Sequence, residues 1–324
     1  MNPVLEIEGL HVKIPWRRGT LHPVQDLCFS VGPAETVCLV GESGCGKSLT
    51  ALAVMGLLPR MAQRTVNRLK LEGEDLSKAT EHRMSEIRGN RMSMIFQEPM
   101  TCLNPCYTVG NQLVEVLRRH KRVSRLQAKE RALQLLEHVG ITAAEHRLKQ
   151  YPHQLSGGLR QRVMIAMALM CEPRLLIADE PTTALDVTIQ AQILGLMKRL
   201  QEEFHLSLVL ITHDLGVVAR TAHRVVVMYA GQIVETGATQ EVFSRPLHPY
   251  TRALMDCIPD PARKKPGQRL GAIPGLVPTL LGLASRCYFS NRCSQVQKEC
   301  LEQAVELREL SPHRSVRCLL YETK

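Results

Sequence analysis

A short glycine-rich loop, Gly41–Ser48, most constrains what this 324-residue chain can fold into, because it has the pattern G-x-x-x-x-G-K-S. The residues before it, Thr36–Val40, form a mostly apolar run after a Gly-Pro turn, which is typical of a buried strand. The residues after it, from Lys47 to Leu58, suit a helix that Pro59 would end. Strand, glycine-rich loop and helix in this order are the context in which such a loop wraps around phosphate groups.

Each residue type in the loop has a physical reason to bind phosphate. Glycines allow the backbone to curl with its N–H groups pointing inward, and the start of the helix adds a positive end. Lys47 would place a cation on the terminal phosphates, and Ser48 would ligate Mg²⁺. The alternative is an ordinary turn with a surface lysine. The residues expected to bind the phosphates of a nucleotide are Gly41, Glu42, Ser43, Gly44, Cys45, Gly46, Lys47, Ser48 and Leu49.

A second element consists of two acids directly after an apolar run. Leu175–Ala178 is typical of a buried strand, and Asp179 and Glu180 follow it. Carboxylates in this position lie at the carboxyl edge of a parallel sheet, where ligands bind. Asp179 would hold Mg²⁺, and Glu180 would act as general base on an attacking water. Taken alone, the pair has a simpler interpretation, a solvated helix start.

A third element, the signature segment Leu155–Leu159, reads L-S-G-G-L. Ser156, Gly157 and Gly158 stand at an expected helix start, which makes an end that attracts anions. In isolation an ordinary helix N-cap is the more common explanation of this pattern.

Strands and helices alternate along the chain, which predicts an α/β fold with a parallel sheet core. Region 97–165 is mostly helical and is expected to form an inserted subdomain of a domain covering 1–245. Prolines interrupt the chain after Phe243, so we expect a separate, loop-rich extension over 246–324. The other expected strands are Leu5–Lys13, Gln25–Val31, Ser207–Ile211 and a hairpin of Arg224–Tyr229 with Gln232–Glu235. The other expected helices are Gln112–Arg119, Arg125–Val139, Gly158–Met170 and Ile189–Phe204.

Composition limits the cellular setting. Hydrophobic residues make up 44% of the chain but aromatic residues only 4%, so the core must be aliphatic. No apolar run reaches the roughly 18 residues of a membrane-spanning helix, and the N-terminus has no signal-peptide pattern, so we expect a cytoplasmic chain. The net charge of +10 suits a solvated basic surface, nucleic acid or an anionic membrane face. No basic run is interleaved with aromatic residues, and we expect no nucleic-acid partner.

Together and in this order, the three elements resemble the ATP-binding cassette (ABC) family across about 5–245. The resemblance extends to Gln97 in Phe96–Glu98, to Ala184-Leu185-Asp186 and to His213. It implies a P-loop fold with a RecA-like core, an N-terminal antiparallel β part and a helical subdomain. It also implies that Gln97 senses the γ-phosphate and Mg²⁺, that His213 contacts the γ-phosphate, and that Asp186 communicates across a dimer.

In this family the signature segment acts on ATP held by the opposite subunit, so the resemblance implies a dimer with two ATP molecules between its subunits. Many cassettes read LSGGQ where this chain reads LSGGL; Ser156 and Gly158 remain, and we expect function to survive. Many also stack adenine on an aromatic residue near the first strand. The matching position here is Ile14, and Trp16 is the candidate for that role, with a capping or buried tryptophan as the alternative.

Three further stretches resemble the ATPase subunits of bacterial dipeptide and oligopeptide importers, specifically the first of their two ATPases. They are Gln97–Pro105, His248–Thr251 and Ile273–Pro278. The resemblance implies a heterodimer with a second ABC ATPase, two membrane permeases, an extracytoplasmic peptide-binding protein, and a peripheral place on the cytoplasmic face of the inner membrane. Related importers carry nickel or glutathione. A soluble ABC ATPase of DNA repair or translation, or a nucleotide-binding regulator without turnover, are the alternatives from other classes.

Four C-terminal cysteines, Cys287, Cys293, Cys300 and Cys318, have the spacing C-x5-C-x6-C-x17-C. Four thiolates suit an iron–sulfur cluster or a structural zinc, but the spacing also allows four unrelated thiols. Peptide-importer ATPases carry a similar set, and this resemblance implies a [4Fe–4S] cluster, with zinc as the alternative. The expected cofactors are therefore ATP with Mg²⁺, and this cluster.

Overall fold

The computed structural model describes residues 2–98, 102–183, 185–257, 271–282 and 285–321. By their internal contacts the residues group into two compact units that alternate along the chain. Unit 1 comprises Met1–Leu5, Val31–Glu35 and Leu71–Ile211, and unit 2 comprises Glu6–Ser30, Thr36–Lys70 and Thr212–Lys324. The predicted domain boundary at 245 stays a prediction, as does the extent of the helical subdomain.

Unit 1 is built on three parallel strands, β7 (Met92–Ile95), β8 (Leu175–Asp179) and β9 (Ser207–Thr212). Every residue of β8 is buried, as expected for a central strand covered on both faces. In the register, Ile95 of β7 pairs with Ala178, and Asp179 pairs with Ile211 of β9. Because parallel strands end at one edge, the residues that follow β7 and β8 meet there.

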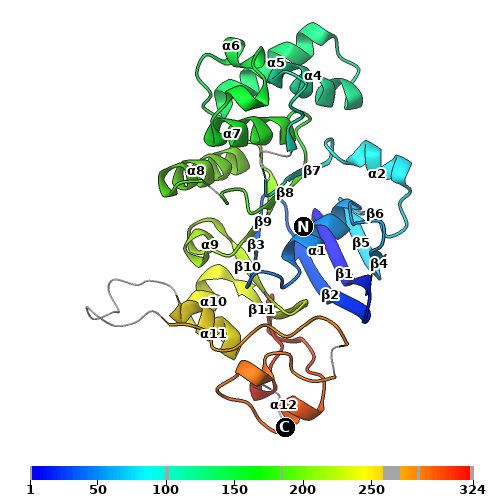
Figure 1. The fold of residues 1–324 in the computed structure, drawn as a ribbon, viewed down its shortest axis with the longest axis vertical. Coiled ribbons are helices and arrows are strands. Elements are labelled where there is room, and N and C mark those ends of the chain that lie inside the picture. The colour runs from blue at the N-terminus through cyan, green and yellow to red at the C-terminus, as the bar shows by residue number, and fades with distance from the viewer. Residues whose placement is uncertain (1, 99–101, 184, 258–270, 283–284, 322–324) are drawn as a thin grey trace, which may run out of the picture. The chain divides into compact units, whose positions relative to one another are not determined.

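Several helices of unit 1 start at side-chain caps. Thr108, Ser124, Ser156 and Asp186 each accept a backbone N–H with the side chain, and Ser124 forms a capping box with Gln127. In Figure 1 the helices α4 to α7 gather on one side of this unit. The helices are α2 (Glu81–Ile87), α4 (Val109–His120), α5 (Arg125–His138), α6 (Ala144–Leu148), α7 (Gly157–Ala168) and α8 (Val187–Glu203), with the short strand β6 (Glu74–Asp75).

Unit 2 holds two groups of strands. In the first, β1 (Leu5–Trp16) lies between β2 (Gly19–Val31) and β5 (Arg68–Leu71), and β4 (Gln63–Thr65) pairs antiparallel with β1. In the second, β3 runs parallel to β10, which forms an antiparallel hairpin with β11. Its strands are β3 (Thr36–Val40), β10 (Arg224–Tyr229), β11 (Gln232–Ala238), β12 (Arg308–Ser311) and β13 (Arg314–Val316).

The C-terminal segment of unit 2 joins this second sheet, which the sequence analysis did not predict. Strand β13 pairs with β11, placing Val316 opposite Glu235. Glu235 is fully buried, and it accepts bonds from the guanidinium of Arg314 at 2.6 Å and from the backbone N–H groups of Leu247 and His248. A buried carboxylate is tolerated when it is paired and hydrogen-bonded in this way.

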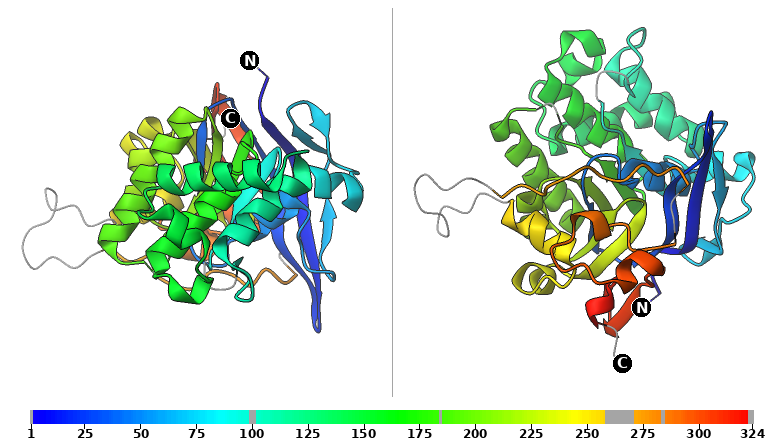
Figure 2. Two further views of the ribbon diagram at one scale, coloured as in Figure 1. Left: turned by 90° about the horizontal axis from the view of Figure 1, so that it is seen from above. Right: turned by 60° about the horizontal axis from the view of Figure 1, so that its bottom comes forward.

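The helices of unit 2 are short. Figure 2 shows the C-terminal segments beside α10 and α11. Helix α1 ends at Met55 rather than at the predicted Leu58, because Gly56 adopts a left-handed φ of 66° and caps the helix with its N–H. The helices are α1 (Lys47–Met55), α9 (Leu215–Thr221), α10 (Thr239–Ser244), α11 (Pro249–Asp256) and α12 (Glu299–Glu302).

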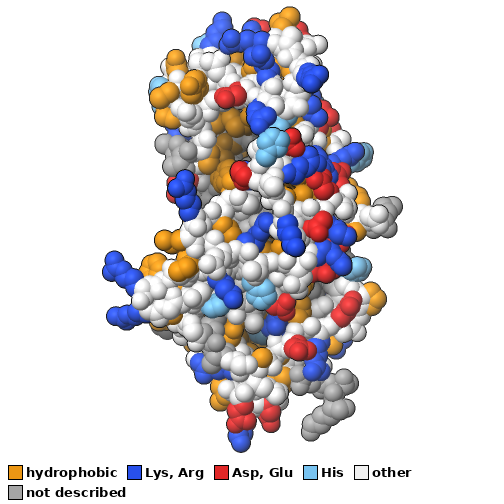
Figure 3. Space-filling model, turned by 90° about the vertical axis from the view of Figure 1, so that its right-hand side faces the viewer, with side chains coloured by type: hydrophobic (Ala, Val, Ile, Leu, Met, Phe, Trp, Pro, Cys, Tyr) orange, Lys and Arg blue, Asp and Glu red, His pale blue; other side chains and the backbone are white. Residues whose placement is uncertain are grey.

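The surface is charged with both signs. Figure 3 shows Lys and Arg side chains gathered over the helices at the upper end of the view, with acidic side chains interspersed below. Across the described residues, no helix combines the length and the apolar character needed to cross a membrane.

Candidate nucleotide-binding site

The backbone of the phosphate loop lies against neighbouring main chain with no room for side chains at two positions. A Cβ added to Gly41 would lie 2.2 Å from the carbonyl oxygen of Met228, and one added to Gly46 would lie 2.1 Å from that of Pro23. Gly46 also has a φ of 105°, which only glycine adopts without strain. The glycines of the motif are thus required by this fold, and they shape the loop that precedes α1.

Lys47 is the first residue of α1, and its side chain folds back over the loop. Its ammonium nitrogen donates to the carbonyl oxygens of Gly41 at 2.8 Å and Glu42 at 3.1 Å, and the residue is 5% exposed. A compact cation held over a concave run of backbone is suited to an anionic ligand. The predicted role of Lys47 therefore has a matching geometry.

Glu42, the second residue of the loop, is held from two sides by the C-terminal part of unit 2. Its backbone N–H donates to the phenolic oxygen of Tyr250 at 2.9 Å. Its carboxylate accepts two bonds from the guanidinium of Arg292, at 2.6 and 2.9 Å. The sequence analysis missed both contacts: Tyr250 stood in a quoted stretch without a role, and nothing pointed to Arg292.

In unit 1, the structure brings together Gln97 and Glu180, two of the residues predicted to act in hydrolysis. Glu180 follows β8, and its Oε2 accepts bonds from the side chains of Gln97 at 3.0 Å and Thr183 at 2.9 Å. Glu180 has a φ of 44°, and its N–H donates to Ile211. Asp179, the last residue of β8, is 5% exposed. Thr183 is a contact that the sequence analysis did not name.

The signature segment leads into α7 as predicted. Ser156 caps that helix by accepting the N–H of Leu159 at 3.4 Å, and both Ser156 and Gly157 are exposed. A Cβ added to Gly158 would lie 3.1 Å from a methyl group of Ile189, so α7 begins close beside α8. Asp186 caps α8 through the N–H of Ile189 at 2.9 Å.

Two further predicted positions are exposed. His213 is exposed directly after β9, and Trp16, the last residue of β1, is 59% exposed, so its adenine contact stays a prediction. Several residues of the stretches that carried the resemblance lie outside the described residues: Pro99, Met100, Thr101 and Ala184.

The prediction of a [4Fe–4S] cluster is wrong. Among the described residues, no group of three or more His, Cys, Asp or Glu side chains could hold a metal ion. Cys287, Cys293, Cys300 and Cys318 do line one small cavity, but it is shared with apolar side chains such as Phe289. Burial raises the pKa of Cys287 to about 11 and also raises the pKa of Cys293 and Cys318.

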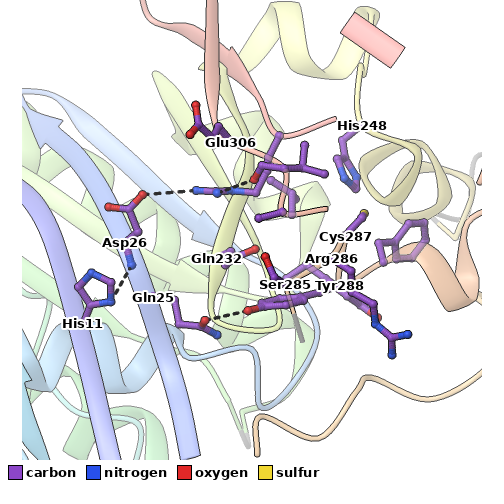
Figure 4. A pocket seen from close by; sticks show the side chains of 16 residues that line it. His11, Gln25, Asp26, Gln232, His248, Ser285, Arg286, Cys287, Tyr288 and Glu306 are labelled. Carbon is purple, nitrogen blue, oxygen red and sulfur yellow. Dashed lines mark hydrogen bonds and ion pairs between the residues drawn. The ribbon is translucent and has the colours of Figure 1, made fainter. Parts of the chain in front are cut away.

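A wider cavity, shown in Figure 4, also lies within unit 2. Gln25 and Tyr288 join across it through a hydrogen bond of 2.9 Å, and Nη2 of Arg317 lies 4.0 Å from Oδ2 of Asp26. None of the residues predicted to bind nucleotide lines it, so we do not assign it to the nucleotide site.

Alkylation of Cys45 is expected to block nucleotide binding, because this thiol lies inside the phosphate loop and is fully buried. Burial raises its pKa, so labelling at neutral pH should be slow and bound ATP should slow it further. Mass spectrometry with parallel ATPase assays would follow both, with the exposed Cys106 as the internal control that ATP does not protect. Complete labelling of Cys45 at an undiminished ATPase rate would refute this expectation.

Known proteins match this chain over almost its full length. The family described as "ABC transporter" matches residues 24–183, and "Oligopeptide/dipeptide transporter, C-terminal region" matches residues 234–300. The oligopeptide transport ATP-binding protein AppD of Bacillus subtilis is 49% identical over 323 residues, which cover 99% of this chain and 98% of that protein. The dipeptide transport ATP-binding protein DppD of Escherichia coli is 45% identical over 315 residues, which cover 97% of this chain and 96% of that protein.

Among solved structures, the dimeric structure of a bacterial ABC transporter cassette aligns with a TM-score of 0.65 at 25% identity, covering 72% of this chain and 98% of that one. The P-loop α/β fold expected from the sequence is thereby confirmed. Matches of this identity and length in both the cassette and the C-terminal region leave one family: the chain belongs to the ABC transporter ATP-binding proteins that carry the oligopeptide/dipeptide transporter C-terminal region, and it is an ATPase.

Proposed function

We propose that this chain is the ATP-hydrolysing subunit of an ABC importer for dipeptides and oligopeptides. The observation that carries the proposal is the identity of 49% over nearly the full length of an oligopeptide transport ATP-binding protein, including the C-terminal region. ABC importer ATP-binding subunits work with membrane permeases. The more specific partners we propose are a second, related ATPase, two permeases and an extracytoplasmic peptide-binding protein.

The phosphate loop would hold ATP. The backbone of Gly41–Ser48, apart from the N–H of Glu42, and the ammonium of Lys47 would bind the phosphates, since preorganised N–H groups and a cation stabilise charge there. Hard oxygen donors suit Mg²⁺, and the hydroxyl of Ser48 and the carboxylate of Asp179 are of this kind. When bound, Mg²⁺ would neutralise charge on the β- and γ-phosphate oxygens.

Hydrolysis needs a base for the attacking water, and Glu180 is proposed for this role. Gln97 and Thr183 donate to the same oxygen of its carboxylate, which holds the group in one orientation. A positioned carboxylate can take the proton of water as the water attacks the γ-phosphorus. Gln97 would thereby link the state of the nucleotide to the helical part of unit 1, and His213 would contact the γ-phosphate.

The signature segment supports a dimeric arrangement. Ser156 and Gly157 are exposed at the start of α7, so their N–H groups and hydroxyl could meet ATP held by another subunit. We propose that Asp186, at the start of α8, passes the state of one site to the other.

Permease contact is proposed for the loop after Gln97. Gln112 fixes the part of this loop from Asn104 to Tyr107, because its side chain accepts from the N–H of Asn104 at 2.9 Å and donates to the carbonyl oxygens of Asn104 and Tyr107 at 3.0 Å. Tyr107 is 52% exposed at the edge of a shallow groove on α4, a suitable seat for a cytoplasmic permease segment. This arrangement supports a peripheral place at the cytoplasmic face of the cell membrane.

The proposal is tested by uptake in a strain of the native host that lacks this chain. Labelled dipeptide or tripeptide uptake should fall to background, while uptake of nickel and glutathione should be retained. Loss of nickel or glutathione uptake with normal peptide uptake would replace the proposed substrate with one of these. Normal uptake of all three would contradict the importer role itself.

A further inference from the structure

One side chain by which the C-terminal part of unit 2 contacts the phosphate loop is itself almost fully enclosed. The guanidinium of Arg292 reaches Glu42 across 250 positions of sequence, and the Arg292 side chain is 4% exposed. Both hydrogen bonds to the carboxylate are short, and the pair is bidentate, which is the strong geometry for an arginine–carboxylate contact. The hydrogen bonds to Glu42 raise the pKa of Arg292, so the group is charged at all ordinary pH values.

The remaining donors of Arg292 are also committed. Its Nε donates to the carbonyl oxygen of Pro274 at 2.8 Å, and its Nη2 to that of Ile273 at 3.2 Å. Tyr229 lies under the guanidinium carbon at 5.8 Å from its ring centroid, and Phe289 at 6.0 Å. A cation held by carbonyl oxygens and aromatic faces has little freedom to follow a moving loop, so it fixes the position of Glu42.

Tyr250 contacts the backbone of the same loop residue, Glu42. Its ring packs against Tyr229 and Phe289, with centroids 4.6 and 5.4 Å away, and it is fully buried. Its hydroxyl accepts the backbone N–H of Glu42, so this N–H is directed into the C-terminal part rather than toward a ligand of the loop. Tyr250 thus holds the backbone of Glu42, and Arg292 holds its side chain. Both Tyr250 and Arg292 contact the rings of Tyr229 and Phe289.

We propose that Arg292 and Tyr250 are positioning residues for nucleotide binding: they hold Glu42, and through it the phosphate loop, in its binding shape. A carboxylate in a loop that binds polyphosphate would repel the ligand if its charge were not balanced. Arg292 balances the charge of Glu42 and holds the phosphate loop in its binding shape. This inference rests on the proposed function of Gly41–Ser48, and it gives the C-terminal part of the chain a role in the ATP site.

The test is a double-variant cycle on the complete chain, with binding of ADP and Mg²⁺ measured by calorimetry so that no hydrolysis step is involved. Arg292→Ala is expected to weaken ADP binding about tenfold, because it leaves a carboxylate uncompensated beside the phosphates. Adding Glu42→Gln to that variant should recover binding to within about threefold of Glu42→Gln alone, since the two residues act through each other.

Tyr250→Phe should weaken ADP binding about threefold by leaving the N–H of Glu42 without its acceptor. Lys298→Ala, which removes an exposed cation of the same C-terminal part, is the control and should leave binding unchanged. Thermal unfolding of each variant confirms that binding is compared between folded proteins.

The possible outcomes distinguish failure of the positioning role from failure of the proposed nucleotide site. Unchanged ADP binding in Arg292→Ala, or a double variant as weak as Arg292→Ala, would overturn the positioning role while leaving the ATPase assignment intact. Failure of the unaltered chain to bind ADP would overturn the proposed nucleotide site and this inference with it.

Discussion

Replacing Glu180 with glutamine is expected to lower ATP turnover at least about 100-fold, the size of a general-base contribution, while ATP remains bound. The amide can keep the contacts with Gln97 and Thr183, whose donors meet one oxygen of the side chain. It cannot take a proton from water. ATP should then accumulate unhydrolysed, and the ATP-bound dimer should persist.

Turnover is measured by phosphate release, and the dimer by gel filtration with ATP and Mg²⁺. Glu202→Gln, which changes an exposed acid of α8 in the same unit, is the matched control and should behave as the unaltered chain. Retained turnover in Glu180→Gln would remove Glu180 from the role of base, and loss of ATP binding would assign it to holding the nucleotide instead.

Replacing Lys47 with alanine is expected to weaken ATP binding at least about 100-fold, because each charge-assisted hydrogen bond to a phosphate contributes about 1.5–3 kcal/mol. The two carbonyl oxygens that now accept from its ammonium, those of Gly41 and Glu42, show that the cation lies over the loop. Turnover should disappear for lack of bound substrate.

Titration with a fluorescent ATP analogue measures this loss, with Lys13→Ala on an exposed position of β1 as the control. The two variants should differ in kind: Lys47→Ala fails at binding, whereas Glu180→Gln binds and does not turn over. Equal ATP affinity of Lys47→Ala and the unaltered chain would contradict the phosphate-loop assignment.

Local sequence patterns predicted the cassette well because the residues that form its phosphate loop and strands are neighbours in the sequence. The strand, loop and helix around Gly41–Ser48 form from neighbouring residues, and the apolar run Leu175–Ala178 is β8 almost to the residue. The contact between Gln97 and Glu180 was not predicted, and it follows from two parallel strands that end at one edge. The end of α1 differed by a few residues because Gly56 offered a better cap than Pro59.

The C-terminal part could not be predicted in the same way, because its contacts are long-range. Strand β13 is three residues long and forms only by pairing with β11, and Arg292 meets Glu42 at a sequence separation of 250. A segment of a few residues without a periodic pattern does not indicate which distant residues it will contact. The cysteine spacing misled because it counts potential ligands and does not show whether the described side chains form a group that could hold a metal ion.

The most direct test of the central claim, that ATP hydrolysis by this chain powers peptide import, is a comparison of complemented strains. A host strain lacking the chain is supplied with the unaltered protein, with Glu180→Gln or with Glu202→Gln, and accumulation of a labelled dipeptide is measured. We predict accumulation with the unaltered protein and Glu202→Gln, and background levels with Glu180→Gln at equal protein abundance. Full accumulation with Glu180→Gln would contradict the account, because import would then proceed without hydrolysis at this site.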